Sequence, residues 1–182
     1  MRTFSCDIET DGIDATKVWC IAVHNIDTNQ VFTFFDTTLG LFKPWLVSEV
    51  DCLIFHNGIS FDVPVLERLL DIDFSNIKIE DTLVMSQLYK PRLDGGHSLS
   101  AWGDRLKLGK GDHTDWSCFS QEMLDYCIRD TQLTTKLYKY LTNSKLSEDA
   151  KNLEYEIKRH CSLQERTGWC FDLKNATSIL QD

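Results

Sequence analysis

The feature that most constrains the fold is a change of pattern about a third of the way along the chain. Three short runs rich in β-branched and aromatic residues come first, at Thr3–Glu9, Val18–Asn25 and Gln30–Phe35. Runs of this kind, separated by turn-rich stretches of hairpin length, predict three strands. From residue 52 onward, strand-like runs alternate with helical ones. This order favours an α/β or α+β fold, a mixed sheet with helices packed on it.

The later elements are predicted from apolar spacing and from the residues that begin and end helices. Ser60 or Asp62 is expected to cap the helix that runs to Leu70, with Pro64 in its first turn. In chain order we expect a helix near Leu39–Val50, a strand at Cys52–Asn57, a helix at Ser60–Leu70, a strand at Ile77–Glu80, and helices at Thr82–Leu88, Ser98–Leu106 and Ser120–Leu141.

The pattern changes again near residue 145. One long helical pattern covers Ser147–Thr167, and Gly168 ends it before a second helical stretch begins. This piece does not resemble part of a sheet domain. We therefore expect a sheet domain over residues 1–145 and a short helical extension over residues 146–182.

Composition narrows the class of protein. The chain has 182 residues, 42% of them hydrophobic and 26% charged, as in an ordinary globular protein. It contains no apolar run of the roughly 18 residues that cross a bilayer, and its first residues lack the apolar stretch of a signal peptide. Its seven cysteines include no C-x-x-C pair, which favours reduced, buried thiols over a disulfide framework or a zinc ribbon. Membrane and secreted proteins are therefore not favoured.

The net charge argues against nucleic-acid binding at first sight. Nineteen basic residues stand against 28 acidic ones, a formal charge of −9. The window Lys90–Lys110 differs, because it holds five basic residues and two acids, a local net of +3. This window is either a surface for the phosphates of a single strand or a chance cluster on a solvated face.

Three groups of acids could hold metal ions. Asp7 and Glu9 project to the same side of the first strand, because strand side chains alternate. Asp62 follows the second apolar strand, and Tyr126 and Asp130 share one face of the long helix. Each group also has an ordinary structural explanation. Asp7 and Glu9 could be two solvated acids at a strand end, Asp62 could be a helix cap, and Asp130 could be a partly exposed structural aspartate. If they converge, four carboxylates suit two Mg²⁺ or Mn²⁺ ions in phosphoryl displacement.

The three groups, in this order, form a known pattern. Asp7-Ile8-Glu9-Thr10, Asn57-x-x-x-Phe61-Asp62 and Tyr126-x-x-x-Asp130 resemble the three motifs of DEDDy exonucleases. These are DnaQ-like 3′–5′ exonucleases with a ribonuclease-H-like fold. HNGISFDVPVL, EDTLVMSQL and HSLSAWGDRLKLGKGDH are similar to the proofreading domain of T7-like phage DNA polymerases of family A. QERTGWCFD resembles the stretch where the polymerase portion of that family begins.

The resemblance implies a role for each matching residue. Asp7 would bridge two ions, Glu9 and Asp130 would complete the first site, and Asp62 would hold the second ion largely through water. Tyr126 would orient the attacking water. Contacts to DNA are expected from motif neighbours, from aromatic residues that could stack on bases, and from the basic window. These residues are Thr10, Asn57, Phe61, Trp102, Trp116, Arg105, Lys107 and Lys110.

Two histidines and one further acid receive no catalytic role. His97 and His113 have no partners at zinc spacing, so we expect surface or substrate-side positions for both. Asp81 resembles an acid found beside the sheet in the family and is not expected to be catalytic.

The resemblance implies a metal-dependent 3′–5′ exonuclease that releases mononucleotides from single-stranded DNA 3′ ends. It would proofread for a polymerase in the same chain or in a separate one, in the cytoplasm of an infected bacterium. Two alternatives remain. One is a free-standing ribonuclease-D-like enzyme acting on RNA, and the other is a catalytically silent domain that binds DNA or a polymerase.

Overall fold

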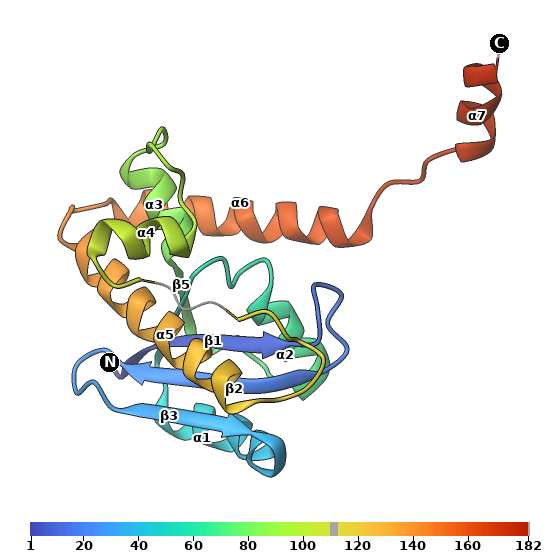
Figure 1. Cartoon of the computed structure of the whole chain (residues 1–182). Coiled ribbons are helices and arrows are strands. Elements are labelled where there is room, and N and C mark those ends of the chain that lie inside the picture. The colour runs from blue at the N-terminus through green and yellow to red at the C-terminus, as the bar shows by residue number, and fades with distance from the viewer. Residues whose placement is uncertain (110–112, 182) are drawn as a thin grey trace.

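The mixed sheet expected from the sequence is present. The computed structural model describes residues 1–109 and 113–181 (Figure 1). Its five strands pair in the order β3-β2-β1-β4-β5. The first three strands are antiparallel, whereas β4 lies parallel to β1 and β5 parallel to β4. The strands are β1 (Thr3–Thr10), β2 (Val18–Asn25), β3 (Val31–Phe35), β4 (Cys52–Phe55) and β5 (Lys78–Asp81).

The helices lie close to their expected positions, with two differences. The predicted helix near Leu39–Val50 is a 3₁₀ helix followed by an α-helix. The predicted side-chain cap at Ser60 or Asp62 is wrong, because Phe61 takes the N-cap position and Asp62 is already helical. The helices are η1 (Asp36–Leu41), α1 (Phe42–Glu49), α2 (Asp62–Leu70), α3 (Thr82–Tyr89), α4 (Leu99–Leu106), α5 (Gln121–Thr142), α6 (Glu148–Thr167) and α7 (Leu173–Gln181).

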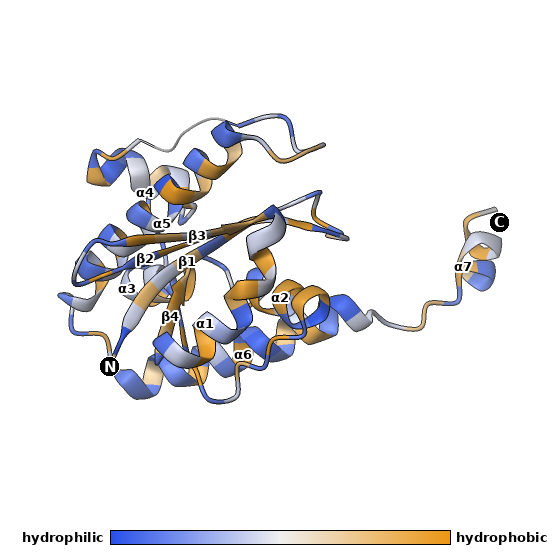
Figure 2. Cartoon of the chain, turned by 90° about the horizontal axis from the view of Figure 1, so that it is seen from below, coloured by the Kyte–Doolittle hydropathy of each residue, from blue (hydrophilic) through white to orange (hydrophobic). Residues whose placement is uncertain are grey.

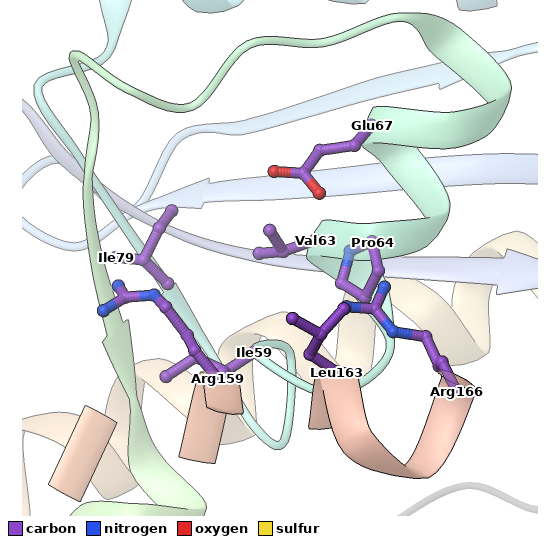
Figure 3. Close-up of a pocket in the computed structure, with 8 residues that line it drawn as sticks. All are labelled: Ile59, Val63, Pro64, Glu67, Ile79, Arg159, Leu163 and Arg166. Atoms are coloured by element: carbon purple, nitrogen blue, oxygen red, sulfur yellow. The ribbon is translucent and has the colours of Figure 1, made fainter. Parts of the chain in front are cut away.

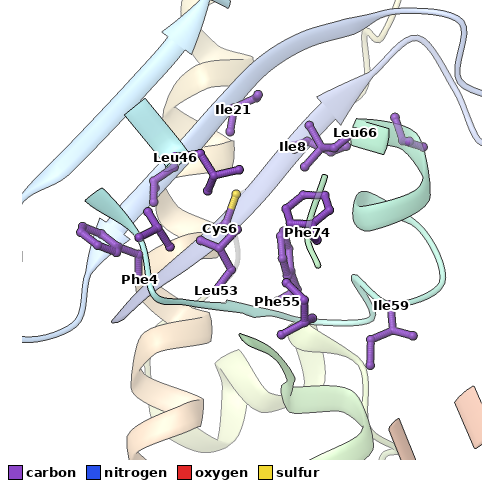
Figure 4. Close-up of a cluster of buried hydrophobic side chains, with 14 of the residues drawn as sticks. Phe4, Cys6, Ile8, Ile21, Leu46, Leu53, Phe55, Ile59, Leu66 and Phe74 are labelled. Atoms are coloured by element: carbon purple, nitrogen blue, oxygen red, sulfur yellow. The ribbon is translucent and has the colours of Figure 1, made fainter. Parts of the chain in front are cut away.

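The two sides of β1 have different partners. Phe4, Cys6 and Ile8 are buried in the main apolar core, where they lie near the side chains of β4 (Figure 4). On the opposite side, the Ser5 hydroxyl donates to the main-chain oxygen of Thr131 in α5 across 2.8 Å. The alternation of β1 therefore turns its polar residues toward α5.

Apolar packing holds the helices on both faces of this sheet. Helix α5 packs against β1 and β2. Helix α1 covers the other face through Phe42 and Leu46, both fully buried, and the Phe42 ring lies 5.2 Å from that of Phe34. Burying a side chain of this size stabilises the fold by about 1.5–3 kcal/mol. Figure 2 shows largely apolar residues along the central strands and alternating apolar and polar residues along the helices around them.

A buried ion pair joins α6 to the sheet. Glu80 of β5 is 1% exposed, and the Lys151 ammonium lies 3.1 Å from its carboxylate. The Tyr155 hydroxyl donates to the same carboxylate across 2.9 Å. The first half of α6 thus packs on the sheet domain, across the predicted boundary at residue 145. Helix α7 stands apart from the rest of the molecule (Figure 1).

Among the described helices, none combines the length and the apolar character that a bilayer-crossing helix needs.

Candidate active site

The predicted catalytic residues gather around one open hollow of about 200 Å³. It lies where β1 and β4 end and α2 begins, with α5 along one side. Its lining includes three aromatic side chains and a histidine besides the acids. The lining residues are Asp7, Ile8, Glu9, His56, Asn57, Phe61, Asp62, Trp116, Tyr126 and Asp130. Segments that are far apart in the sequence thus bring the three motifs together.

Strand β1 delivers the first two acids to this hollow. Asp7 and Glu9 lie opposite Ala22 and Cys20 of β2, on the side of the sheet that α5 covers. The register shifts between Glu9 and Thr10, so the strand pairing becomes irregular just after the acids. Thr10 lines an adjoining hollow of about 270 Å³, together with Phe61 and Trp116. The threonine of this motif therefore lies next to the acids.

The loop between β4 and α2 is tightly constrained. Asn57 adopts a positive φ of 69°, a conformation that asparagine tolerates better than most residues. A side chain at Gly58 would bring its Cβ within 2.2 Å of the Phe55 Cβ, so the close turn requires glycine. The loop leads directly into Asp62, and its geometry sets where that carboxylate lies.

Asp81 supports this loop from behind. Its fully buried carboxylate accepts hydrogen bonds from the main-chain N–H groups of Asn57 at 2.9 Å and Ile59 at 3.2 Å. It also accepts from the N–H of Leu83, which caps α3. Burial raises the pKa of Asp81, and these N–H donors oppose the rise. Asp81 therefore positions the site loop.

Asp62 is a carboxyl group that is costly to ionise in the protein alone. It is 6% exposed, and burial raises its pKa to about 7. The charge of Asp81 contributes to this rise, while the main-chain N–H groups of Asp62 itself and Ile8 oppose it. A cation beside Asp62 would favour its ionised form.

Helix α5 contributes Tyr126 and Asp130, one turn apart on the same face. The Tyr126 ring lies 5.9 Å from the Trp116 ring and 6.2 Å from the His113 ring. His113 itself packs edge-on against Trp116, with 4.7 Å between centroids. An aromatic group thus borders the acids on the α5 side, and His113 belongs to it.

The donor atoms fit a divalent cation. One ligand atom from each of Asp7, Glu9 and Cys127 lies within 4.8 Å of the other two. Among the described residues that line the hollow, several are carboxylates and none is a lysine or an arginine. Carboxylate oxygens are the ligands that Mg²⁺ and Mn²⁺ prefer. Asp7 and Glu9 are therefore placed to hold such an ion, and Asp62 and Asp130 line the same hollow.

Some residues expected to contact DNA lie elsewhere. Trp102 is 2% exposed, and its indole N–H donates to the Ser86 hydroxyl across 2.8 Å. Its predicted stacking on a base is wrong, because its ring belongs to the core. Arg105 donates to the main-chain oxygen of Gly96 across 2.8 Å and so holds the preceding loop. Lys107 follows α4 in a left-handed conformation, and the prediction for Lys110 lies outside the described residues.

His56 also lines the hollow, although sequence reasoning does not select it. Its ring Nδ1 lies 2.9 Å from the Thr82 hydroxyl, beside the Asp81 support. The one available signal is its position directly after an apolar strand and before Asn57. For Trp116 the sequence suggests stacking alone, and the structure places this residue between the acids and the adjoining hollow.

A second hollow, of about 240 Å³, lies between α2 and α6 (Figure 3). Apolar side chains such as Ile79 and Leu163 line it, with Arg159, Arg166 and Glu67 at its edge. It shares no lining residue with the hollow that holds the acids. With one carboxylate beside two guanidinium groups, it does not offer the donors of a metal site.

The strand order and the acids at the ends of β1 and β4 define a protein of the ribonuclease-H-like fold class. The RNase_H superfamily profile matches residues 5–101, which span most of β1, all of β2 to β5 and the first two acidic motifs. The chain belongs to the RNase_H superfamily.

Curated relatives place the chain beside phage polymerases. It is 26% identical to the DNA-directed DNA polymerase of Escherichia phage T7 and 25% identical to that of Enterobacteria phage T3. Each alignment covers 92% of this chain and 33% of the polymerase. The chain therefore spans about a third of the length of these relatives.

Solved structures agree on the fold. Brucella melitensis NrnC with bound Mg²⁺ aligns with a TM-score of 0.67 at 19% identity, over 93% of this chain and 87% of NrnC. The catalytic core of RRP6 from Trypanosoma brucei gives 0.62 at 19% identity, over 89% and 46% of the two chains. Phi29 DNA polymerase complexed with single-stranded DNA gives 0.53 at 19% identity, over 78% and 32%. The architecture is thus shared by proteins of low sequence identity, a DNA polymerase among them.

Proposed function

We propose that the chain is a metal-dependent 3′–5′ exonuclease that removes mononucleotides from DNA 3′ ends. The observation that carries this proposal is the convergence of Asp7, Glu9, Asp62, Tyr126 and Asp130 on one open hollow. Retention of all four acids and the tyrosine argues against a catalytically silent domain.

Each residue has a role that follows from its position. The four carboxylates would hold one or two Mg²⁺ or Mn²⁺ ions, and such ions activate water and stabilise the charge that develops on a phosphate. Tyr126 would orient the attacking water from the α5 side. Phe61 and Trp116, which line both adjoining hollows, would contact the terminal nucleotide beside Thr10. Asn57 would contact the DNA from the constrained loop between β4 and α2.

DNA is the favoured substrate, because the relatives that match 92% of the chain are DNA polymerases. We propose that residues 1–145 form the exonuclease and that residues 146–182 begin a polymerase portion, supplied in the same chain or as a separate one. Proofreading in an infected bacterial cytoplasm is the corresponding setting. A hollow that receives one strand end should favour frayed or unpaired termini over paired ones.

RNA is the second candidate, since the motifs also allow a ribonuclease-D-like enzyme and the fold is similar over about nine-tenths of the chain to that of NrnC, solved with bound pGG, and of RRP6. The two candidates make different predictions for the same assay, because a DNA-editing enzyme should not prefer ribonucleotides. RNA preference would promote the second candidate over the first.

The test is digestion of 5′-labelled single-stranded DNA and RNA of the same sequence, with Mg²⁺ and with EDTA. We expect a ladder that shortens from the 3′ end of DNA, release of 5′-mononucleotides, and complete inhibition by EDTA. A mismatched 3′ terminus on duplex DNA should be removed faster than a paired one. If neither substrate gives a product, the proposed enzymatic activity is rejected.

A further inference from the structure

A buried thiol, that of Cys127, lies next to two of the acids that line the hollow. Cys127 stands three residues before Asp130 on α5, so the two share a face of the helix. Its thiol donates to the main-chain oxygen of Asp7 across 3.3 Å. One soft sulfur donor therefore accompanies the hard oxygen donors at this point of the site.

The spacing allows a shared ion. The Cys127 sulfur and one carboxylate oxygen from each of Asp7 and Glu9 lie within 4.8 Å of one another. Zinc bonds of about 2.3 Å to sulfur and 2.0–2.2 Å to oxygen put two ligand atoms of one tetrahedral ion about 3.6 Å apart. Side-chain rotations that shorten these gaps by up to about 1 Å would thus bring all three atoms to one tetrahedral ion.

Mg²⁺ and thiophilic ions should use this group differently. Mg²⁺ prefers oxygen ligands and would take the carboxylates without the sulfur. Zn²⁺ and Co²⁺ accept thiolate together with carboxylate. The presence of a cysteine at this position therefore gives the site a second, softer binding mode.

Cys20 provides a matched comparison. It lies opposite Glu9 in β2 and is fully buried in the same apolar cluster as Cys127, together with Ala22 and Met123. Cys20 does not belong to the group of potential ligands found among the described residues. The two thiols share one environment but differ in their relation to the acids.

We propose that this site binds thiophilic divalent cations through Cys127, Asp7 and Glu9, whereas Mg²⁺ would use the two carboxylates without the sulfur. The ion displaces the thiol proton, which passes to solvent, and a metal–sulfur bond forms without oxidation of the cysteine. Zn²⁺ bound in this way competes with Mg²⁺ and inhibits the exonuclease, a consequence that rests on the proposed function. The binding itself does not rest on it.

The test uses Co²⁺ as a spectroscopic probe, under reducing conditions. Cys118, Cys161 and Cys170 are exposed, so all three are first replaced by serine to remove adventitious thiol ligands. In this background we expect a sulfur-to-cobalt charge-transfer band on titration, and Zn²⁺ should abolish it by displacement. Cys127→Ser should remove the band and lower the affinity for Zn²⁺ by roughly tenfold or more. Cys20→Ser should keep the band.

Asp7→Asn completes the design, because it leaves both thiols in place and should weaken the band if the acids share the ion. Circular dichroism confirms that each variant is folded. A band that survives Cys127→Ser, or no band at saturating Co²⁺ in the background protein, would overturn the proposal. If the band depends on Cys127 and Asp7 but Mg²⁺ supports no digestion of DNA or RNA, the exonuclease assignment fails and the cation site stands.

Discussion

Two buried carboxylates, those of Glu80 and Asp62, have opposite electrostatic surroundings. Glu80 is surrounded by compensating groups, namely the Lys151 ammonium, the Lys78 ammonium and the Tyr155 hydroxyl. Asp62 is just as well buried, but its neighbours include the Asp81 carboxylate, and burial raises its pKa to about 7. The first cluster is complete within the protein, whereas the second gains from an added cation. Burial of an acid therefore marks a candidate site only where the protein itself does not neutralise it.

The largest expected effect comes from removing carboxylates of the hollow that contains Asp62. The double variant Asp7→Ala, Glu9→Ala should lower exonuclease activity by at least about 10³-fold, because the two substitutions remove carboxylates proposed to hold the cations. Thermal stability should not fall, since like charges in one hollow repel each other. Digestion rates and melting curves measure the two effects, with the exposed Asp27→Ala as control. Persistent activity would mean that the metal site is misplaced.

The next largest effect concerns the stability that the ion-pair cluster around Glu80 gives to the fold. Glu80→Gln leaves Lys151 buried beside a neutral amide and should cost about 3–5 kcal/mol of unfolding free energy. Activity per folded molecule should change little, because no atom of Glu80 lines the acidic hollow. Urea unfolding gives the free energy, with Glu148→Gln as the matched control. Glu148 binds the same lysine from the surface, with 64% of its side chain exposed, and should contribute less than about 1 kcal/mol. Equal losses of unfolding free energy for the two variants would show that the buried Glu80 contributes no more than the exposed Glu148.

A third measurement sharpens the comparison through pH. In EDTA, Asp62 should stay protonated in the folded state up to pH about 7, whereas the unfolded chain ionises it near its usual value of 3.8. The unfolded state then releases a proton that the folded state keeps, so stability should fall as pH rises from about 4 to 7. A rise of about 3 pKa units, at about 1.4 kcal/mol each, bounds the loss near 4 kcal/mol.

Asp62→Asn should lack this component, and its stability should depend less on pH over the same range. Added Mg²⁺ should reduce the difference between the two proteins above pH 7, because the cation favours the ionised carboxylate. Melting temperatures across the pH series measure both effects. Parallel pH curves for the two proteins in EDTA would contradict the assignment of the raised pKa to Asp62.

The smallest effect concerns the basic window, which belongs to neither cluster. Replacing Lys90, Arg92 and Lys107 by glutamine should reduce the slope of log K against log salt for single-stranded DNA by about 0.7 for each phosphate that the protein no longer neutralises. Arg105 is left intact because it holds the Gly96 loop. An unchanged slope would show that this window does not bind the phosphates of the DNA. The arginines of the hollow between α2 and α6 would then be the next residues to test.

Local patterns predict which acids share a face of a strand or helix, the family resemblance joins the three groups into one candidate site, and tertiary packing explains what both miss. Alternation along β1 predicts that Asp7 and Glu9 share a side, and helical spacing does the same for Tyr126 and Asp130. The burial of Trp102 depends on its packing against α3 and α5, so an isolated aromatic residue in a basic window is misleading. Likewise, the support that Asp81 gives to Asn57 joins residues 24 positions apart. No local pattern reports such an interaction.

The order in which the site is assembled follows from the path of the chain through the sheet. Asp7 lies near the start of the chain, and Asp130 lies near the end of the sheet domain, on a helix that packs against β1 and β2. During synthesis the first acids leave the ribosome long before α5 can dock, and such non-local pairing is slow to form. A nascent chain would therefore carry no working nuclease until most of the domain has emerged and folded. Cleavage activity would serve as a direct readout of completed folding.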